Sequence, residues 1–147
     1  MIRDDITVRL AGESGEGVIS GGDILTTGAA RTGYWAVTFR TYPAEIKGGP
    51  CMYQVRVGVD GVRSQGNAVD LLVCFNQEAF DLHHHELAAD GHIVCDAESV
   101  KVSPEYLSIA ACDFSGSRAN VSLFISRNEG AWPKLISRWW RATSCSL

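Results

Sequence analysis

The sequence predicts an α/β domain built on an open, mainly parallel sheet with flanking helices. Strand-like runs alternate with helical patterns in the order strand, helix, strand, strand, helix, strand. The apolar run VDLLVCF (69–75) is bounded by Asn67 and Asn76, which is typical of a buried central strand. The chain has 147 residues, 46% of them hydrophobic, which suits one domain with a core of its own.

The first half of the chain shows both the period-two pattern of strands and the 3.6-residue pattern of helices. Residues 6–12 (ITVRLAG) alternate, turn apolar and end in glycine, which predicts a strand. Apolar residues at helical spacing follow a glycine-rich turn and predict a helix that ends near Gly33. YWAVTF (34–39) and CMYQVRVGV (51–59) are rich in β-forming residues and predict a second and a third strand.

The second half is regular only at its start. An Asp-Gly pair is typical of hairpins, so VRSQG (62–66) is expected as a short return strand. Beyond the central strand, residues 76–91 predict a helix and HIVCD (92–96) a further strand. We expect the domain to occupy residues 1–112. Residues 113–147 show no stable period and are expected to be a divergent or truncated tail.

Composition and charge exclude several classes of protein. The formal net charge of −4 gives no general attraction for nucleic acid, and no apolar run approaches the roughly 20 residues that span a bilayer. The N-terminus does not resemble a signal peptide. The odd number of cysteines, five, and the N-terminus together indicate reduced thiols in the cytoplasm. None of them stands in a C-x-x-C pair, so no zinc or iron–sulfur cluster is expected within this chain.

The first motif is the glycine-rich turn LAGESGEGVISGG. Gly12, Gly15 and Gly17 stand between a predicted strand and a predicted helix, where backbone amides and the helix N-terminus suit an anion. The order G-x-x-G-x-G is neither the dinucleotide fingerprint nor a P-loop. Glu13 and Glu16 would repel a phosphate unless they point away. A tight strand-to-helix turn that serves packing alone is the equal alternative.

The second motif is the connector FRTYPAEIKGGP (39–50). Its prolines and paired glycines restrict the backbone, so its side chains are presented at fixed positions. Arg40 and Lys47 could hold an anion, and Glu45 could pair with either of them. The alternative is a plain crossover with a local ion pair. We expect the connector to lie beside the glycine turn at one rim of the sheet.

Other constellations favour structural roles. Consecutive helical residues point about 100° apart, so His83, His84 and His85 are interpreted as a solvated or subunit-facing surface rather than a metal site. Asp70 is expected to terminate a turn. Ser14 lacks the second glycine of a nucleophile elbow and no Asp/His pair is evident, so a serine hydrolase is not expected.

Three segments together resemble the gamma domain of the 2-oxoacid:ferredoxin oxidoreductases. They are GESGEGVISGGDIL, FRTYPAEIKGGPCMYQVRV and SQGNAVDLLVCFNQEAF, in that order. The resemblance covers roughly Ile6 to Asp96. It is strongest to the branch in which this domain begins the alpha subunit, as in 2-oxoglutarate enzymes, and it implies a Rossmann-like three-layer fold.

The resemblance also implies a function. Such enzymes convert a 2-oxoacid and coenzyme A to acyl-CoA, carbon dioxide and reduced ferredoxin, using thiamine diphosphate and iron–sulfur clusters. The chain shows no thiamine or cluster motif, so we expect an accessory component with alpha-type and beta-type partner subunits and no catalytic or metal-binding residues of its own. Coenzyme A or subunit contacts are expected at Gly12, Gly15, Gly17, Arg40 and Lys47, and subunit contacts at Tyr42, Pro43, Glu45, Ile46, Gly48 and Gly49. A self-standing phosphate- or nucleotide-binding module and an inactive truncated fragment are the alternatives.

Overall fold

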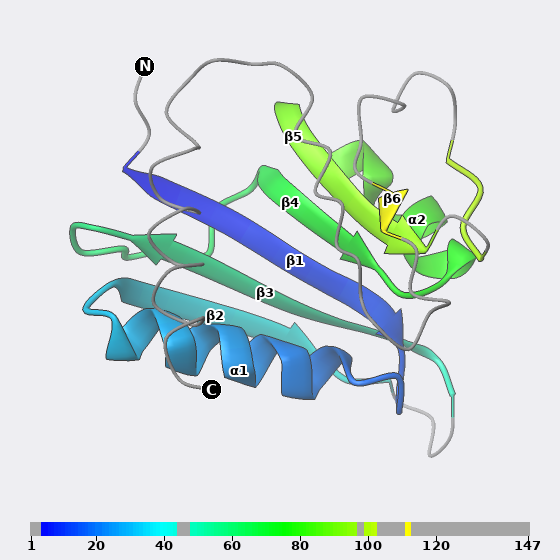
Figure 1. Cartoon of the computed structure of the whole chain (residues 1–147), viewed down its shortest axis with the longest axis horizontal. Coiled ribbons are helices and arrows are strands. Elements are labelled where there is room, and N and C mark those ends of the chain that lie inside the picture. The colour runs from blue at the N-terminus through cyan, green and yellow to red at the C-terminus, as the bar shows by residue number, and fades with distance from the viewer. Residues whose placement is uncertain (1–3, 44–47, 97–98, 103–110, 113–147) are drawn as a thin grey trace.

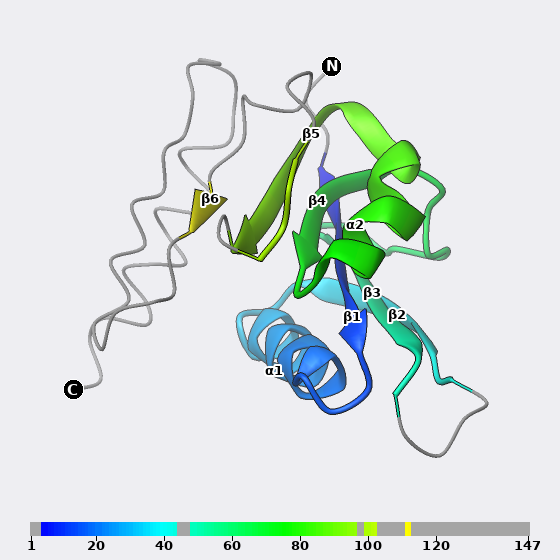
Figure 2. The same ribbon diagram turned by 90° about the vertical axis from the view of Figure 1, so that its right-hand side faces the viewer.

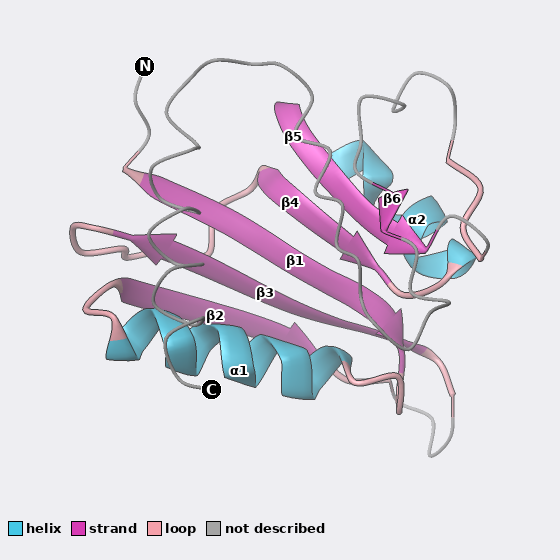
Figure 3. Ribbon diagram, viewed as in Figure 1, coloured by secondary structure: helices cyan, strands magenta, loops and turns pink. Residues whose placement is uncertain are grey.

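The computed structural model describes residues 4–43, 48–96, 99–102 and 111–112. Their helices and strands alternate along the chain much as the sequence predicts (Figure 3). The elements are β1 (Asp5–Glu13), α1 (Val18–Arg31), β2 (Trp35–Thr41), β3 (Pro50–Gly58), β4 (Val69–Cys74), α2 (Gln77–His83), the 3-10 segment η1 (His84–Glu86), β5 (Leu87–Asp96) and β6 (Ala111–Cys112).

The described strands form one open, six-stranded sheet in the order β2-β3-β1-β4-β5-β6 (Figure 1). The pairs β1–β4, β4–β5 and β5–β6 are parallel, whereas β1–β3 and β2–β3 are antiparallel. The predicted α/β class with an open, mainly parallel sheet is confirmed, with β2 and β3 as an antiparallel extension. The parallel pair β1–β4 brings the carboxyl ends of both strands to one rim, where ligands bind in open α/β sheets.

The two helices cover opposite faces of the sheet (Figure 2). Helix α1 packs on β1, β2 and β3, and α2 packs on β1 and β4 on the other side. Side chains of β1 alternate between the two faces of the sheet and contribute to the core on both sides. Val8 and Leu10 face α1, whereas Ala11 faces α2. The buried residues therefore form two clusters, one on each side of the sheet.

The predicted helix 76–91 is wrong beyond its first half. Helix α2 ends at His83, and β5 begins at Leu87. Pairing with β4 decides this, because Val69 lies opposite Leu87 and the ladder resumes after a bulge. A Cβ atom at Gly91 would lie 2.9 Å from the Val69 carbonyl oxygen, so this glycine permits a close approach. The helical propensity of LAAD is overridden by tertiary pairing.

The predicted return strand at 62–66 is also wrong. This segment has no strand assignment, and side chains of β3 bind its backbone instead. The Gln54 side-chain amide donates to the Gln65 carbonyl (2.8 Å), and the Arg56 guanidinium donates to the Ser64 carbonyl (3.3 Å). Because the carbonyls are satisfied in this way, the segment needs no ladder of its own.

The side chains of Cys51, Cys74 and Cys95 are buried, as expected for thiols that pack as small hydrophobic groups. No helix in the described part of the chain is long and apolar enough to cross a membrane. The predicted tail, 113–147, lies outside the described residues, so the division after residue 112 stays a prediction.

Candidate functional site

The glycine turn joins the end of β1 to the start of α1. Gly15 and Gly17 adopt φ values of 105° and 95°, which only glycine adopts readily. Gly12 serves packing, because a Cβ atom there would lie 2.6 Å from the Glu16 carboxylate and 2.8 Å from Phe75 Cβ. The packing role of this turn is therefore observed, and residues 13–17 of the turn are exposed at the N-terminus of α1.

Glu16 points back into the turn rather than away from it. Its Oε2 atom accepts hydrogen bonds from the Glu13 backbone N–H (2.6 Å) and from the Asn76 side-chain amide (3.0 Å). The Oδ1 atom of Asn76 accepts from the Ala79 N–H (2.9 Å) and so caps α2. The Glu16 carboxylate thus already accepts a backbone N–H that could otherwise bind an anion, and it links the turn to the start of α2.

The connector lies against the glycine turn, as expected from the sequence. The Ser14 N–H donates to the Gly49 carbonyl (3.2 Å), and Pro50 lies opposite Glu13 in the sheet. Gly48 and Gly49 have φ values of 74° and 99°. A Cβ atom on Gly48 would lie 2.8 Å from the Glu13 carboxylate, so the two segments approach closely.

The remaining predicted connector residues fall into two groups. Tyr42 and Pro43 follow β2 directly, and the ring of Pro43 would lie 2.9 Å from a Cβ atom on Gly49. The predicted contacts Glu45, Ile46 and Lys47 lie outside the described residues. The assignment of these residues to cofactor or subunit contacts stays a prediction.

Arg40 lies on the α1 side of β2 and already has partners. Its Nη1 atom is 3.7 Å from the Asp23 carboxylate on α1, and its guanidinium lies 5.8 Å from the ring centroid of Tyr53 and 6.0 Å from that of Tyr42. The Tyr53 hydroxyl donates to the same carboxylate (2.8 Å). Because 48% of the Arg40 side chain is exposed, it can still exchange Asp23 for another anion.

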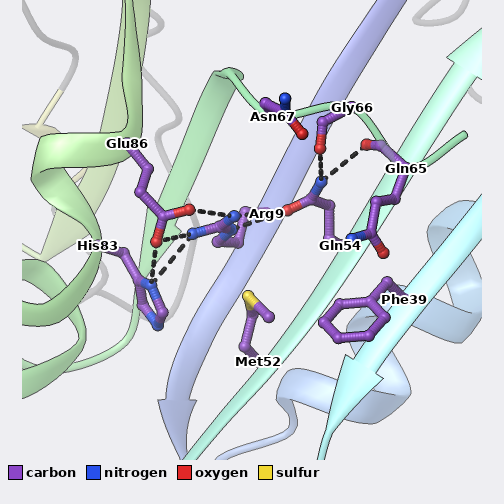
Figure 4. Close-up of a pocket in the computed structure, with 9 residues that line it drawn as sticks. All are labelled: Arg9, Phe39, Met52, Gln54, Gln65, Gly66, Asn67, His83 and Glu86. Atoms are coloured by element: carbon purple, nitrogen blue, oxygen red, sulfur yellow. Dashed lines mark hydrogen bonds and ion pairs between the residues drawn. The ribbon is translucent and has the colours of Figure 1, made fainter.

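A buried polar network on the opposite face was not predicted from the sequence (Figure 4). Arg9 on β1 donates from Nε and Nη2 to the Gln54 side-chain oxygen (2.9 and 2.7 Å). Its Nη2 and Nη1 atoms also contact the two Glu86 oxygens (2.8 and 2.7 Å), and Nη1 contacts His83 Nδ1 (3.1 Å). These contacts engage all five N–H groups of the Arg9 guanidinium, so every Arg9 donor has an acceptor within the network.

The charges of this network compensate one another. The hydrogen bond from Arg9 lowers the pKa of the Glu86 carboxyl from its ordinary 4.5 to about 2. Burial and then the Arg9 charge lower the pKa of His83. Arg9 therefore clamps η1 to β1 and β3 and offers no vacant donor to a ligand. The sequence held one sign that Arg9 is buried. Period-two alternation along the strand places Arg9 on the same face as Thr7 and Ala11.

Two other predictions concern Asp70 and the three consecutive histidines. Asp70 lies inside β4 rather than at a turn, and its Oδ2 atom accepts from the Thr7 N–H (2.8 Å). The three consecutive histidines diverge: His83 joins the Arg9 network, His84 Nδ1 lies 2.9 Å from the Phe80 carbonyl, and His85 is exposed. No group of three metal-ligating side chains occurs among the described residues.

Comparison with known proteins agrees with this architecture. The family model described as "Pyruvate ferredoxin/flavodoxin oxidoreductase" matches residues 7–127. The 2-oxoglutarate oxidoreductase subunit KorA of Mycobacterium tuberculosis is 28% identical over 65% of this chain and 16% of its own length. The 2-oxoglutarate synthase subunit KorC of Archaeoglobus fulgidus is 27% identical over 65% of this chain and 52% of its own length.

Solved structures give the same answer. The 2-oxoglutarate:ferredoxin oxidoreductase from Magnetococcus marinus, solved with 2-oxoglutarate, coenzyme A and succinyl-CoA bound, is 36% identical with a TM-score of 0.69, over 76% of this chain and 20% of that chain. The keto/oxoacid ferredoxin oxidoreductase gamma subunit from Geobacter sulfurreducens is 25% identical with a TM-score of 0.63, over 76% of this chain and 61% of that chain. This chain thus spans a small part of some relatives and about half of others. It belongs to the pyruvate ferredoxin/flavodoxin oxidoreductase family.

Proposed function

We propose that this chain is the accessory, gamma-type component of a cytoplasmic 2-oxoacid:ferredoxin oxidoreductase. That enzyme converts a 2-oxoacid and coenzyme A to acyl-CoA and carbon dioxide and passes two electrons to ferredoxin. Alpha-type and beta-type partner subunits would carry the thiamine diphosphate and the iron–sulfur clusters. The family membership and the likeness to a gamma subunit support this assignment.

The specific role that we propose is to hold part of coenzyme A at the rim formed by the glycine turn and the connector. The observation that carries this proposal is the hydrogen bond from Ser14 N–H to Gly49 O, which joins the two segments. The rim presents the N-terminus of α1, whose first intrahelical bond is from Gly21 N–H to Gly17 O (2.8 Å). The preceding N–H groups and the partial positive charge of the helix end suit a phosphate.

The charges around this rim set a condition on the ligand. The Glu16 carboxylate already accepts hydrogen bonds from the Glu13 N–H of the turn and from the Asn76 side chain, so a phosphate cannot take its place in the turn itself. A coenzyme A phosphate would lie outside the turn, between the N-terminus of α1 and Arg40, and we expect Lys47 to supply the second cation. Arg40 would exchange its exposed contact with Asp23 for the phosphate, which costs little because surface ion pairs are worth about 0–1 kcal/mol.

The test is coenzyme A affinity of the assembled enzyme, with the full chain co-expressed with its alpha-type and beta-type subunits. Removal of one charge-assisted hydrogen bond costs about 1.5–3 kcal/mol, so Arg40→Ala and Lys47→Ala should each weaken coenzyme A binding about 10- to 100-fold. Arg31→Ala, at the far end of α1, is the matched control. Unchanged affinity in both variants would remove both residues from the site. Tight binding of an adenine nucleotide by the isolated chain would favour a self-standing nucleotide-binding module instead.

A further inference from the structure

Strand β2 turns its large apolar side chains away from the helix that covers the sheet beside it. Its register with β3 places Trp35, Val37 and Phe39 on the face opposite α1, and Ala36 and Arg40 on the α1 side. An antiparallel strand with one solvated face normally has its apolar residues inward and its polar residues outward. In β2 this pattern is reversed, and Trp35 and Phe39 are 61% and 41% exposed.

The described helices leave this part of the sheet uncovered. Helix α2 lies on the same face but packs over β1 and β4 (Figure 2). Its buried residues Ala79 and Phe80 join the cluster around Leu72 and Cys74, which lies on the β4 side. The β2–β3 half of that face therefore presents apolar side chains that no helix among the described residues covers.

A pocket of about 340 Å³ opens between Phe39 and the Arg9 network (Figure 4). Phe39 and Met52 supply apolar groups to its lining, and Gln65 and Asn67 supply polar groups. The part of the pocket that Arg9 and Glu86 line carries no net charge, because the Glu86 carboxylate lies 2.7 Å from the Arg9 guanidinium and compensates its charge. An ionic ligand would be desolvated there without a vacant counter-charge, so the pocket selects an uncharged group.

We propose that Trp35, Phe39 and this pocket form the surface on which the rest of the 2-oxoacid oxidoreductase docks, with an uncharged apolar side chain of the partner seated in the pocket. We call this surface the β2 face. The inference rests on the proposed function and adds to it a second contact surface, separate from the coenzyme A rim.

Two observations favour the enzyme body as the occupant. Relatives carry the equivalent of this chain either within a much longer chain or as a shorter subunit: it spans 20% of the Magnetococcus marinus chain and 61% of the Geobacter sulfurreducens subunit. When the same domain is part of a longer chain in one enzyme and a separate subunit in another, the separate subunit needs a non-covalent surface to contact the rest of the enzyme. The second observation is that the connector follows β2 directly in the chain, and its Tyr42, a predicted subunit contact, is 63% exposed.

The composition of the β2 face also fits a protein partner. Interface cores are enriched in tryptophan, phenylalanine and methionine and depleted of uncompensated charge. Trp35, Phe39 and Met52 supply those aromatic and sulfur groups, and the neighbouring Arg9–Glu86 pair is neutral overall. Aromatic side chains of this kind carry much of the binding energy when they are buried against a pocket on the partner.

The experiment measures binding of the full chain to its co-expressed alpha-type and beta-type subunits by co-purification and by titration. Trp35→Ser and Phe39→Ser should each weaken binding by at least about tenfold. Ile24→Ser is the matched control, because Ile24 is 71% exposed and lies on α1, on the other face of the sheet. Circular dichroism and thermal melts of each variant establish that the fold is retained.

The outcomes separate the two proposals. If the unsubstituted chain does not bind these subunits, the proposed function fails, and the inference fails with it. If the unsubstituted chain binds and Trp35→Ser and Phe39→Ser bind equally well, the β2 face is not the docking surface, while the function stands. An equal loss in Ile24→Ser would also overturn the inference. Sedimentation that shows a dimer of the chain alone, dispersed by Phe39→Ser, would assign the face to a second copy.

Discussion

Replacement of Glu86 by glutamine removes the charge that compensates Arg9 and leaves the shape of the side chain nearly unchanged. The Arg9 side chain is only 6% exposed, whereas that of Glu86 is 35% exposed. Loss of one partner from a fully buried ion pair costs about 3–5 kcal/mol. Solvent screens the exposed part of Glu86, and the glutamine oxygen still accepts one hydrogen bond, so we expect Glu86→Gln to lose about 2 kcal/mol of unfolding free energy.

The assay is urea unfolding of the full chain at pH 7, followed by far-ultraviolet circular dichroism. A loss of about 2 kcal/mol lowers the urea midpoint by about 1 M for a typical small domain. Asp90→Asn is the control, because Asp90 is an exposed acidic residue of β5 and Asn keeps its shape. It should change the unfolding free energy by less than about 0.5 kcal/mol.

The pH dependence gives a second, independent check. The pKa of Glu86 is depressed to about 2 in the folded chain, so the stability it contributes is complete above about pH 4.5. That contribution is lost as the pH falls toward 2. The difference in unfolding free energy between the unsubstituted chain and Glu86→Gln should therefore shrink between pH 4.5 and pH 2. A variant as stable as the parent at pH 7, or a difference that does not change with pH, would refute the assignment of Arg9 and Glu86 as a structural clamp.

Two further predictions concern packing and thiol chemistry. A Cβ atom at Gly22 would overlap the Tyr53 ring, so Gly22→Ala should lose about 1–3 kcal/mol in urea unfolding although alanine favours helices, and Gly61→Ala, in open space, should not. Equal stability of the two variants would contradict the packing. Burial, and then the nearby Cys95, raise the pKa of the Cys74 thiol to about 12. Iodoacetamide at pH 8 should therefore spare Cys74 in the folded chain and alkylate it in urea, as peptide mass spectrometry can measure; equal rates in both states would show that the thiol is accessible.

The positions of most elements follow from the sequence because local signals agree with the tertiary structure. Strand β3 reads as alternating β-formers, α1 begins after the glycine turn at Val18, and β4 is a short apolar run between asparagines. The close approach of the connector and the glycine turn agrees with the order of motifs, since β1 ends and its antiparallel neighbour β3 begins there. Glycine and proline at these positions restrict the backbone whatever surrounds them.

The remaining features depend on contacts between residues far apart in the chain, which have no local signal. Residues 87–91 have helical propensity, yet pairing with Val69 and its neighbours makes them a strand. Glu16 reaches an amide of Asn76, 60 residues away, and Arg9 meets Glu86, 77 residues away. The sequence alone determined most of the strands, the first helix and the rigid turns. Only the tertiary structure decided which face of β2 is apolar, because the register of a strand, rather than its composition, sets the side on which each side chain lies.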